Sequence, residues 1–92
     1  MIKSFRHKGL ERFLATGSAR GIQPHHAARL RRQLTQLNVV ERPDEMNVPG
    51  WRLHRLHGEL KDFWTIEVSG NWRLIFRFSG TNVEQVDYVD YH

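Results

Sequence analysis

Apolar residues recur with the period of a helix in the first part of the chain, and they alternate with the period of a strand after position 42. The segment Lys8 to Thr16 is predicted to form a helix with Leu10, Phe13 and Leu14 on one face. Gly17 follows directly and is a typical residue for the left-handed end of a helix. The pattern therefore predicts one short amphipathic helix near the start of the chain.

A second helix is predicted from Pro24 to about Asn38, because proline fits the first position of a helix, where its missing N–H needs no partner. Its leucines form one stripe and its arginines another. The exposed stripe either binds an acidic partner or only faces water, as most charged helix faces do. The apolar stripe holds Ala27, Leu30, Leu34 and Leu37, and the polar one holds His25, Arg29, Arg32 and Gln36, with Arg31 to the side.

The second half of the chain is predicted to be a meander of antiparallel strands, because its turns at Gly70-Asn71 and Gly80 to Asn82 are short. Met1 to Arg6 is a further short candidate strand, and Arg42 to Gly50 reads as a connector. The fold class is therefore α+β, with two N-terminal helices packed on one face of a small antiparallel sheet and the other face open. The predicted strands of the meander are Trp51 to Leu56, Phe63 to Ser69, Trp72 to Ser79 and Val83 to Tyr91.

The length of 92 residues indicates one domain, residues 1–92, because two independent cores need more chain. The absence of cysteine excludes a disulfide framework, a cysteine nucleophile and Cys-ligated zinc. No apolar run approaches the length needed to span a bilayer, and Met1 to Leu10 lacks the apolar core of a secretory signal. We therefore expect a cytoplasmic protein without a membrane partner.

Positive charge is concentrated in the first half of the chain. Residues 1–40 hold eight basic side chains and one acidic side chain, whereas residues 41–92 hold six basic and nine acidic ones. Arginine accounts for 11 of the 14 basic residues, and its planar donor fork suits phosphate. The charge pattern favours a polyanion or an acidic protein as partner, although a solvated helix face would give the same pattern.

Groups suited to RNA cleavage are predicted to gather at one side of the sheet. RNA cleavage by its own 2′-hydroxyl needs a base, an acid and a positive charge, which histidine and arginine supply. Asp90 would orient an imidazole, and Tyr91 would donate a hydrogen bond or stack on a base. These residues also have interpretations without a catalytic role: an exposed His54, an ion-paired Arg73, frayed terminal residues, and a solvated His25-His26 pair. The predicted catalytic residues are His54, Arg73, Asp90, Tyr91 and His92.

A metal site is the alternative for the histidines, because His54 and His57 have the spacing that aligns two ligands on a helix. On a strand, this odd separation puts the two side chains on opposite faces, so that one ion does not meet both. We therefore predict neither a metal nor a cofactor.

Motifs along the whole chain resemble those of the HigB toxins of bacterial toxin–antitoxin pairs, within the RelE/ParE superfamily. The ending Asp87-Tyr88-Val89-Asp90-Tyr91-His92 is the most specific of them. The others are Met1 to Phe5, His7 to Leu10, Leu53-His54 with Leu56 and Gly58, and Asn71-Trp72-Arg73 with Phe76 and Phe78.

The resemblance implies a RelE-like fold and an endoribonuclease that cleaves mRNA codons in the ribosomal A site and inhibits translation. It implies the catalytic set named above, with Arg73 on the phosphate, and RNA binding by His57, Asn71 and Arg73. Related toxins often have lysine in place of His57 and sometimes a basic residue in place of Ser69. This chain therefore lacks a fixed positive charge at both positions. The implied partners are the ribosome, mRNA and a HigA-type helix-turn-helix antitoxin, through which alone the toxin would reach operator DNA.

Two other functions fit the same residues. ParE relatives share the fold but poison DNA gyrase by binding alone, which requires no proton-transfer groups. A basic RNA-binding module without activity is the other alternative. The histidines favour the nuclease, and the sequence leaves open whether His54 or His92 is the base.

Overall fold

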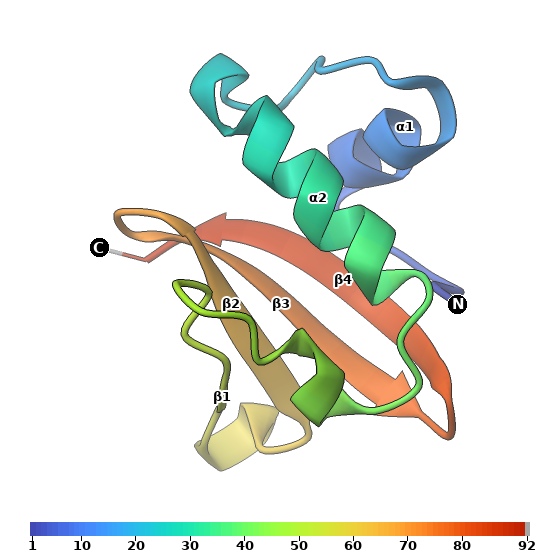
Figure 1. Ribbon diagram of the computed structural model, residues 1–92, viewed down its shortest axis with the longest axis vertical. Helices are drawn as coiled ribbons and strands as arrows, with labels where there is room; N and C mark the ends of the chain where they lie inside the picture. The colour runs from blue at the N-terminus through green and yellow to red at the C-terminus, as the bar shows by residue number, and fades with distance from the viewer. Residues whose placement is uncertain (92) are drawn as a thin grey trace.

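Two helices lie on one face of an antiparallel sheet in the computed structural model, which describes residues 1–91 (Figure 1). Helix α1 (Lys8–Thr16) begins where the imidazole of His7 accepts the Leu10 N–H at 3.1 Å. It ends at Gly17, whose φ of 79° is left-handed and whose N–H donates to the Phe13 carbonyl. The first predicted helix is therefore confirmed, with the predicted bounds.

The second predicted helix is also confirmed, although its first turn is tighter than an α-helix. Pro24 opens a 3-10 turn, η1 (Pro24–His26), which continues directly into α2 (Ala27–Leu37). Three of the four predicted stripe residues, Leu30, Leu34 and Leu37, are completely buried. The leucine stripe therefore attaches α2 to the rest of the core.

The sheet, as described over residues 1–91, has four antiparallel strands in the order β1-β2-β3-β4. Gly70, with a φ of 56°, makes the turn between the second and third strands. The α+β class and the meander are therefore confirmed, and two short 3-10 turns, η2 and η3, interrupt the connections. The bounds are β1 (His54–Arg55), β2 (Phe63–Ser69), β3 (Trp72–Ser79), β4 (Asn82–Asp90), η2 (Pro43–Met46) and η3 (Gly58–Leu60).

The first six residues run along β4 in parallel but do not form the regular strand that the sequence predicted. Two isolated bridges, from Ile2 to Val83 and from Phe5 to Val86, replace it. Gln85 lies between these bridges with a φ of 56°, and its N–H donates to the Ser4 hydroxyl at 2.9 Å. This bulge in β4 interrupts the ladder, so the pairing is local.

The predicted strand from Trp51 to Leu56 is reduced to the two residues of β1. Arg52 has a φ of 55°, which an extended strand does not allow, so the chain turns before it joins the sheet. The prediction of a regular strand was therefore wrong for the residues before His54. From His54 onward the chain pairs with β2, and this pairing fixes the face that His54 occupies.

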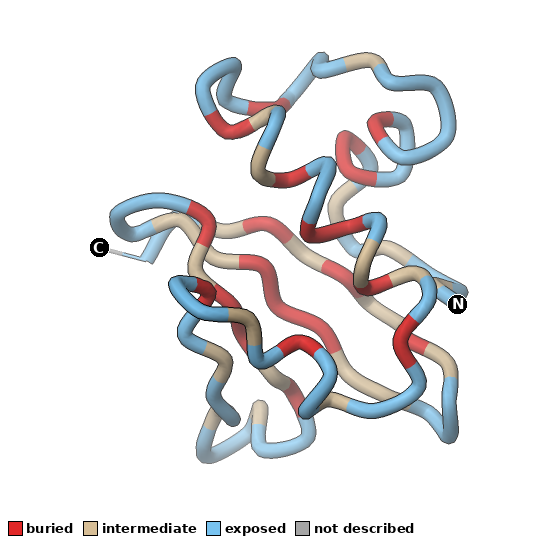
Figure 2. Tube along the Cα trace, viewed as in Figure 1, coloured by how far each residue is buried: buried red, intermediate tan, exposed pale blue. Residues whose placement is uncertain are grey.

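The core lies between the helices and the sheet, as the buried stretches of α1, α2, β2, β3 and β4 show in Figure 2. The opposite face of the sheet has no helix on it (Figure 1) but is not fully exposed. Phe63, Thr65 and Ile75 are buried there, and the Arg77 guanidinium lies 5.8 Å from the centre of the Phe63 ring. Buried core residues include Leu10, Phe13, Leu30, Leu34, Leu37, Ile66, Leu74, Phe76, Val83 and Val86. Among the described residues, no helix has the length and apolar character to cross a bilayer.

Candidate active site

His54 and Arg73 lie on the same face of the sheet, the one that the helices do not cover. The register pairs His54 with Thr65, and it pairs Arg73 with Glu67 on the same strand, two residues further on. Residues two apart on a strand share a face, so all four belong to one surface. From the standard strand spacing, the Cα atoms of His54 and Arg73 are roughly 12 Å apart, which is a distance that a nucleotide can bridge.

The imidazole of His54 is exposed and held in one orientation. Its Nδ1 lies 2.9 Å from the backbone carbonyl of Arg52. A carbonyl only accepts hydrogen bonds, so Nδ1 carries the proton and Nε2 is the nitrogen left to face solvent. In its neutral form, His54 therefore presents a lone pair on Nε2, which is what a proton-transfer group requires.

Arg73, Asn71 and Tyr91 meet at the turn between β2 and β3. The Arg73 guanidinium donates to the carbonyls of Gly70 and Trp72, which hold it against the turn. The Tyr91 N–H donates to the Asn71 carbonyl at 2.9 Å, so the end of the chain is attached to the same turn. Three of the predicted site residues therefore converge, and the Tyr91 side chain is 45% exposed.

Asp90 lies on the other face, which corrects the prediction that it gathers with His54 and Arg73. The register places Asp90 opposite Trp72 and places Arg73 opposite Val89. Side chains alternate along a strand, so Asp90 falls on the helix-covered side, near Tyr88. Its negative charge contributes to a raised pKa of Tyr88, although burial is the larger cause. His92, the remaining member of the predicted trio, lies outside the described residues.

His57 is separated from the other predicted RNA-binding residues. It precedes η3 in the connection between β1 and β2, whereas Asn71 lies in the turn at the opposite end of β2. The seven residues of β2 make this separation roughly 20 Å. The structure therefore does not bring His57, Asn71 and Arg73 into one cluster, although His57 and Asn71 are both exposed.

His26 is buried, and the expectation that His25 and His26 only solvate the helix was wrong for it. Its Nδ1 lies 2.6 Å from the Tyr88 hydroxyl, and its side chain is 1% exposed. Burial lowers the pKa of His26, and the neighbouring charge of His25 lowers it further. Tyr88 stacks on Trp72 at 4.5 Å, so this cluster joins the start of α2 to the end of β4.

The sequence did contain a signal for this burial. His26 precedes Leu30 by four residues, so it extends the leucine stripe of α2 by one turn. The partner was not predictable in the same way, because Tyr88 lies 62 residues further along the chain.

The loop before His54 is attached to α2 by hydrogen bonds from Arg29. The sequence placed Arg29 on the polar stripe of the helix, so these contacts were not predicted. Arg29 donates from Nη2 to the Gly50 carbonyl at 2.8 Å and to the Glu67 carbonyl at 3.3 Å. Gln33 donates to the same Glu67 carbonyl at 2.8 Å, and the Glu67 N–H donates to the Trp51 carbonyl at 2.7 Å. Position 67 of β2 therefore connects the helix, the loop and the sheet.

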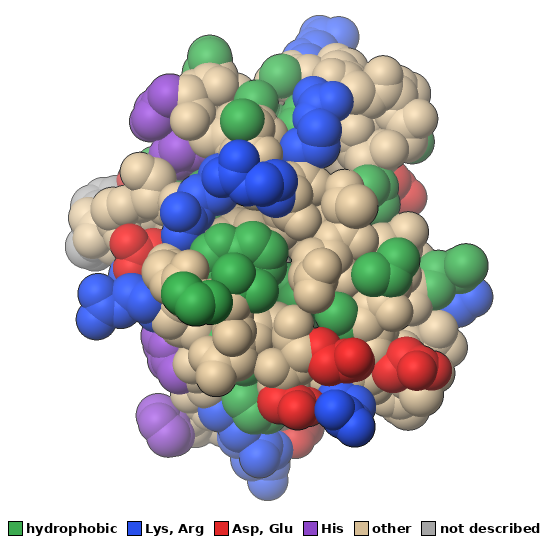
Figure 3. All heavy atoms as spheres, in the orientation of Figure 1, with side chains coloured by type: hydrophobic (Ala, Val, Ile, Leu, Met, Phe, Trp, Pro, Cys, Tyr) green, Lys and Arg blue, Asp and Glu red, His purple; other side chains and the backbone are tan. Residues whose placement is uncertain are grey.

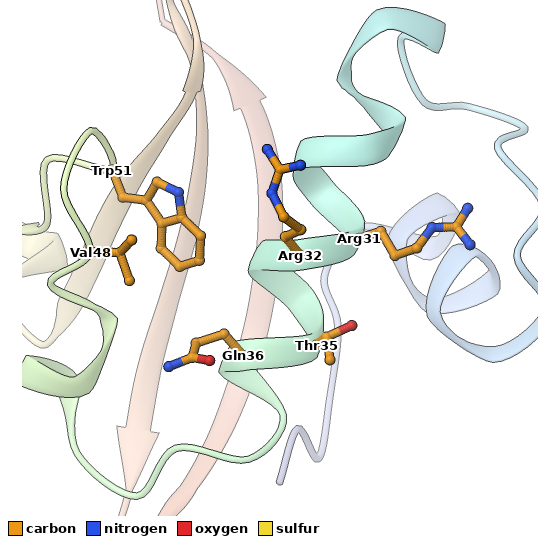
Figure 4. Close-up of a pocket in the computed structure, with 6 residues that line it drawn as sticks. All are labelled: Arg31, Arg32, Thr35, Gln36, Val48 and Trp51. Atoms are coloured by element: carbon orange, nitrogen blue, oxygen red, sulfur yellow. The ribbon is translucent and has the colours of Figure 1, made fainter.

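A hollow of about 450 Å³ lies between α2 and the loop before β1 (Figure 4). Figure 4 shows Trp51 and Val48 across the hollow from α2, while Arg31 points away toward α1. None of the residues that line it has an imidazole or a carboxylate, so it offers no proton-transfer group. The histidine side chains visible in Figure 3 lie along the left edge of the molecule, away from this hollow.

The comparisons agree with the fold and with the resemblance drawn from the motifs. A family model described as the RelE-like toxin of the type II toxin–antitoxin system HigB matches residues 3–92. The protein is thus a RelE-like toxin, the kind that a cell makes together with an antitoxin. Within that class the chain belongs to the HigB family. It is 34% identical to the Endoribonuclease HigB of Proteus vulgaris over 92 residues, which cover 100% of both chains. These findings give no support to the gyrase-binding alternative.

Proposed function

We propose that this toxin is a ribosome-dependent endoribonuclease that cleaves mRNA codons in the A site and thereby stops translation. The observation that carries the proposal is the geometry of His54. The Arg52 carbonyl fixes its Nδ1 proton, its Nε2 faces solvent, and Arg73 lies on the same open face. The name of the Proteus vulgaris relative supports the same activity.

The cleavage is a transfer of the phosphoryl group to the neighbouring 2′-hydroxyl. A base removes the 2′-hydroxyl proton, the 2′-oxygen bonds to phosphorus, and the bond from phosphorus to the 5′-oxygen breaks. An acid gives the 5′-oxygen a proton, so the products are a 2′,3′-cyclic phosphate and a 5′-hydroxyl. His54 serves as one of the two proton-transfer groups, with His92 proposed as the other from the family resemblance.

Arg73 stabilises the charge that builds up on the phosphate, because its guanidinium stays protonated throughout the reaction. Its present partners are two turn carbonyls, and it exchanges them for phosphate oxygens when RNA binds. Tyr91 stacks on an exposed base beside this turn, and Asn71 holds the Tyr91 backbone. Asp90 acts from the opposite side of the strand, by orienting the end of the chain.

His57 contacts the RNA at a distance from the scissile phosphate. The roughly 20 Å from His57 to Asn71 corresponds to several nucleotides of an extended strand. Its exposed imidazole donates a hydrogen bond to a phosphate oxygen there.

The ribosome supplies the positioning that this small surface does not supply alone. The basic first half of the chain, with eight basic residues and one acidic residue, fits ribosomal RNA. The protein acts in the cytoplasm, where translation takes place. Its antitoxin is of the HigA helix-turn-helix type, and the toxin reaches operator DNA only through that antitoxin. The chemistry proposed here uses the chain's own groups and calls for neither a metal nor a cofactor.

Primer extension on mRNA from cells that express the toxin tests the proposal. New 5′ ends within coding frames, which disappear when translation initiation is blocked, are the expected result. Intact messages together with stalled DNA replication would refute it and would point to gyrase. The His54→Ala protein, expressed at the same level, is the matched control for cleavage by other nucleases.

A further inference from the structure

Arg52 has an unfavourable backbone conformation beside His54. Its φ of 55° lies in the left-handed region, which glycine adopts at little cost and other residues adopt rarely. Gly50, two residues earlier in the same loop, has a φ of 88°. Strained residues of this kind cluster at functional sites, so the presence of a long side chain at position 52 calls for an explanation.

The backbone of Arg52 orients the candidate catalytic imidazole. Its carbonyl lies 2.9 Å from Nδ1 of His54, as described above. The loop that carries it is attached on both sides of Trp51, through Arg29 to the Gly50 carbonyl and through the Glu67 N–H to the Trp51 carbonyl. The Arg52 side chain therefore extends from a clamped loop, next to the group that transfers protons.

The side chain itself contributes little to the fold. Nε of Arg52 lies 3.8 Å from a carboxylate oxygen of Glu67, and the Arg52 side chain is 77% exposed. The Glu67 side chain is only 25% exposed, but an ion pair at this distance whose arginine is so open to water stabilises a protein only slightly. Glu67 lies on the open face directly opposite Arg73 in the register, so its carboxylate lies beside the proposed path of the RNA.

We propose that Arg52 binds an RNA phosphate next to the one that is attacked, and that Glu67 occupies its guanidinium until RNA arrives. A carboxylate and a phosphodiester both present two oxygens to the guanidinium fork, so one replaces the other. The inference rests on the proposed function, because it assumes that RNA crosses this face at His54. Arg73 contacts the attacked phosphate, and Arg52 contacts its neighbour.

The two partners have opposite effects on RNA affinity. Arg52→Ala removes a phosphate contact, so we expect affinity to fall about tenfold and the salt dependence to decrease by about 0.7 in slope. Glu67→Gln removes the competing carboxylate and its repulsion of phosphate, so we expect affinity to rise several-fold. The probe is a single-stranded oligoribonucleotide with 2′-O-methyl groups, which has no free 2′-hydroxyl and is not cleaved.

Two further variants separate binding from folding. Arg42→Ala is the matched control, because Arg42 is also an exposed arginine paired with a carboxylate, that of Asp44, in the connector before β1. The RNA affinity of Arg42→Ala should equal that of the wild type. Arg52→Gly keeps the carbonyl that holds His54 and relieves the left-handed strain. We expect it to melt at or above the wild-type temperature while binding RNA as weakly as Arg52→Ala.

Unchanged affinity in Arg52→Ala, weaker binding in Glu67→Gln, or no binding by the wild type would overturn the inference. A lower melting temperature in Arg52→Gly would overturn it as well, because the side chain would then serve the fold. Cleavage of a translated message by the wild type, run in parallel, tests the proposed function separately. If the wild type cleaves and Arg52→Ala binds normally, only the role of Arg52 is lost.

Discussion

The hydrogen bond between His26 and Tyr88 should contribute measurably to stability, because both of its ends are buried. The two atoms are 2.6 Å apart, and the side chains are 1% and 4% exposed. Tyr88→Phe removes the hydroxyl but keeps the ring that stacks on Trp72 at 4.5 Å. The imidazole is left with an unpaired buried nitrogen, which costs about 1–3 kcal/mol.

Urea denaturation at pH 7 measures this loss directly. In a thermal melt, each kcal/mol of lost stability lowers the melting temperature of a domain of this size by about 4–8 °C. Tyr91→Phe is the matched control, because the Tyr91 side chain is 45% exposed, and its change should stay within about 0.5 kcal/mol. If Tyr88→Phe is as stable as the wild type, the buried hydrogen bond does not support the end of β4 as we describe.

Four other results follow from the structure. His54→Ala should lower the rate of RNA cleavage by roughly 10²–10⁴-fold without unfolding the protein, as cleavage kinetics and circular dichroism will show. Arg73→Ala should lower the same rate by roughly 10²–10³-fold. Burial and the charge of His25 lower the pKa of His26 in the folded protein. As the pH falls, His26 is therefore protonated in the unfolded chain before it is protonated in the folded one. The free energy of unfolding should therefore fall as the pH drops below about 6.5, by at most about 1.4 kcal/mol per pH unit, and His26→Phe should flatten this slope. Gly17→Ala should cost about 1–2 kcal/mol in urea denaturation, purely through its φ of 79°, because an added Cβ meets nothing within 4 Å.

Local signals in the sequence were sufficient for the helices and the meander. The period of the leucines, Gly17 at a left-handed end, Pro24 at a first turn and Gly70 in a hairpin each act on near neighbours in the chain. All four features are present in the structure. Such signals are readable because their physical causes, backbone sterics and side-chain periodicity, lie within a few residues.

Features that depend on distant partners were not predictable in the same way. The sequence placed Asp90 with His54 and Arg73, and only the register with β3 shows that Asp90 falls on the side of Trp72. The burial of His26 depends on its contact with Tyr88, which lies 62 residues further along the chain. The turn at Arg52 depends on a left-handed backbone conformation. Because the residue is not a glycine, the sequence contains no signal for that conformation.

The chemical identity of the RNA ends tests the central claim most directly. Attack by the 2′-hydroxyl, assisted by His54 on the open face, predicts a 2′,3′-cyclic phosphate on the upstream fragment and a 5′-hydroxyl on the downstream one. Mass spectrometry of a message cleaved by the purified toxin in a reconstituted translation system identifies both. These ends, absent when His54→Ala replaces the wild type, are the predicted result. Fragments with a 3′-hydroxyl and a 5′-phosphate, or undiminished cleavage by His54→Ala, would contradict it.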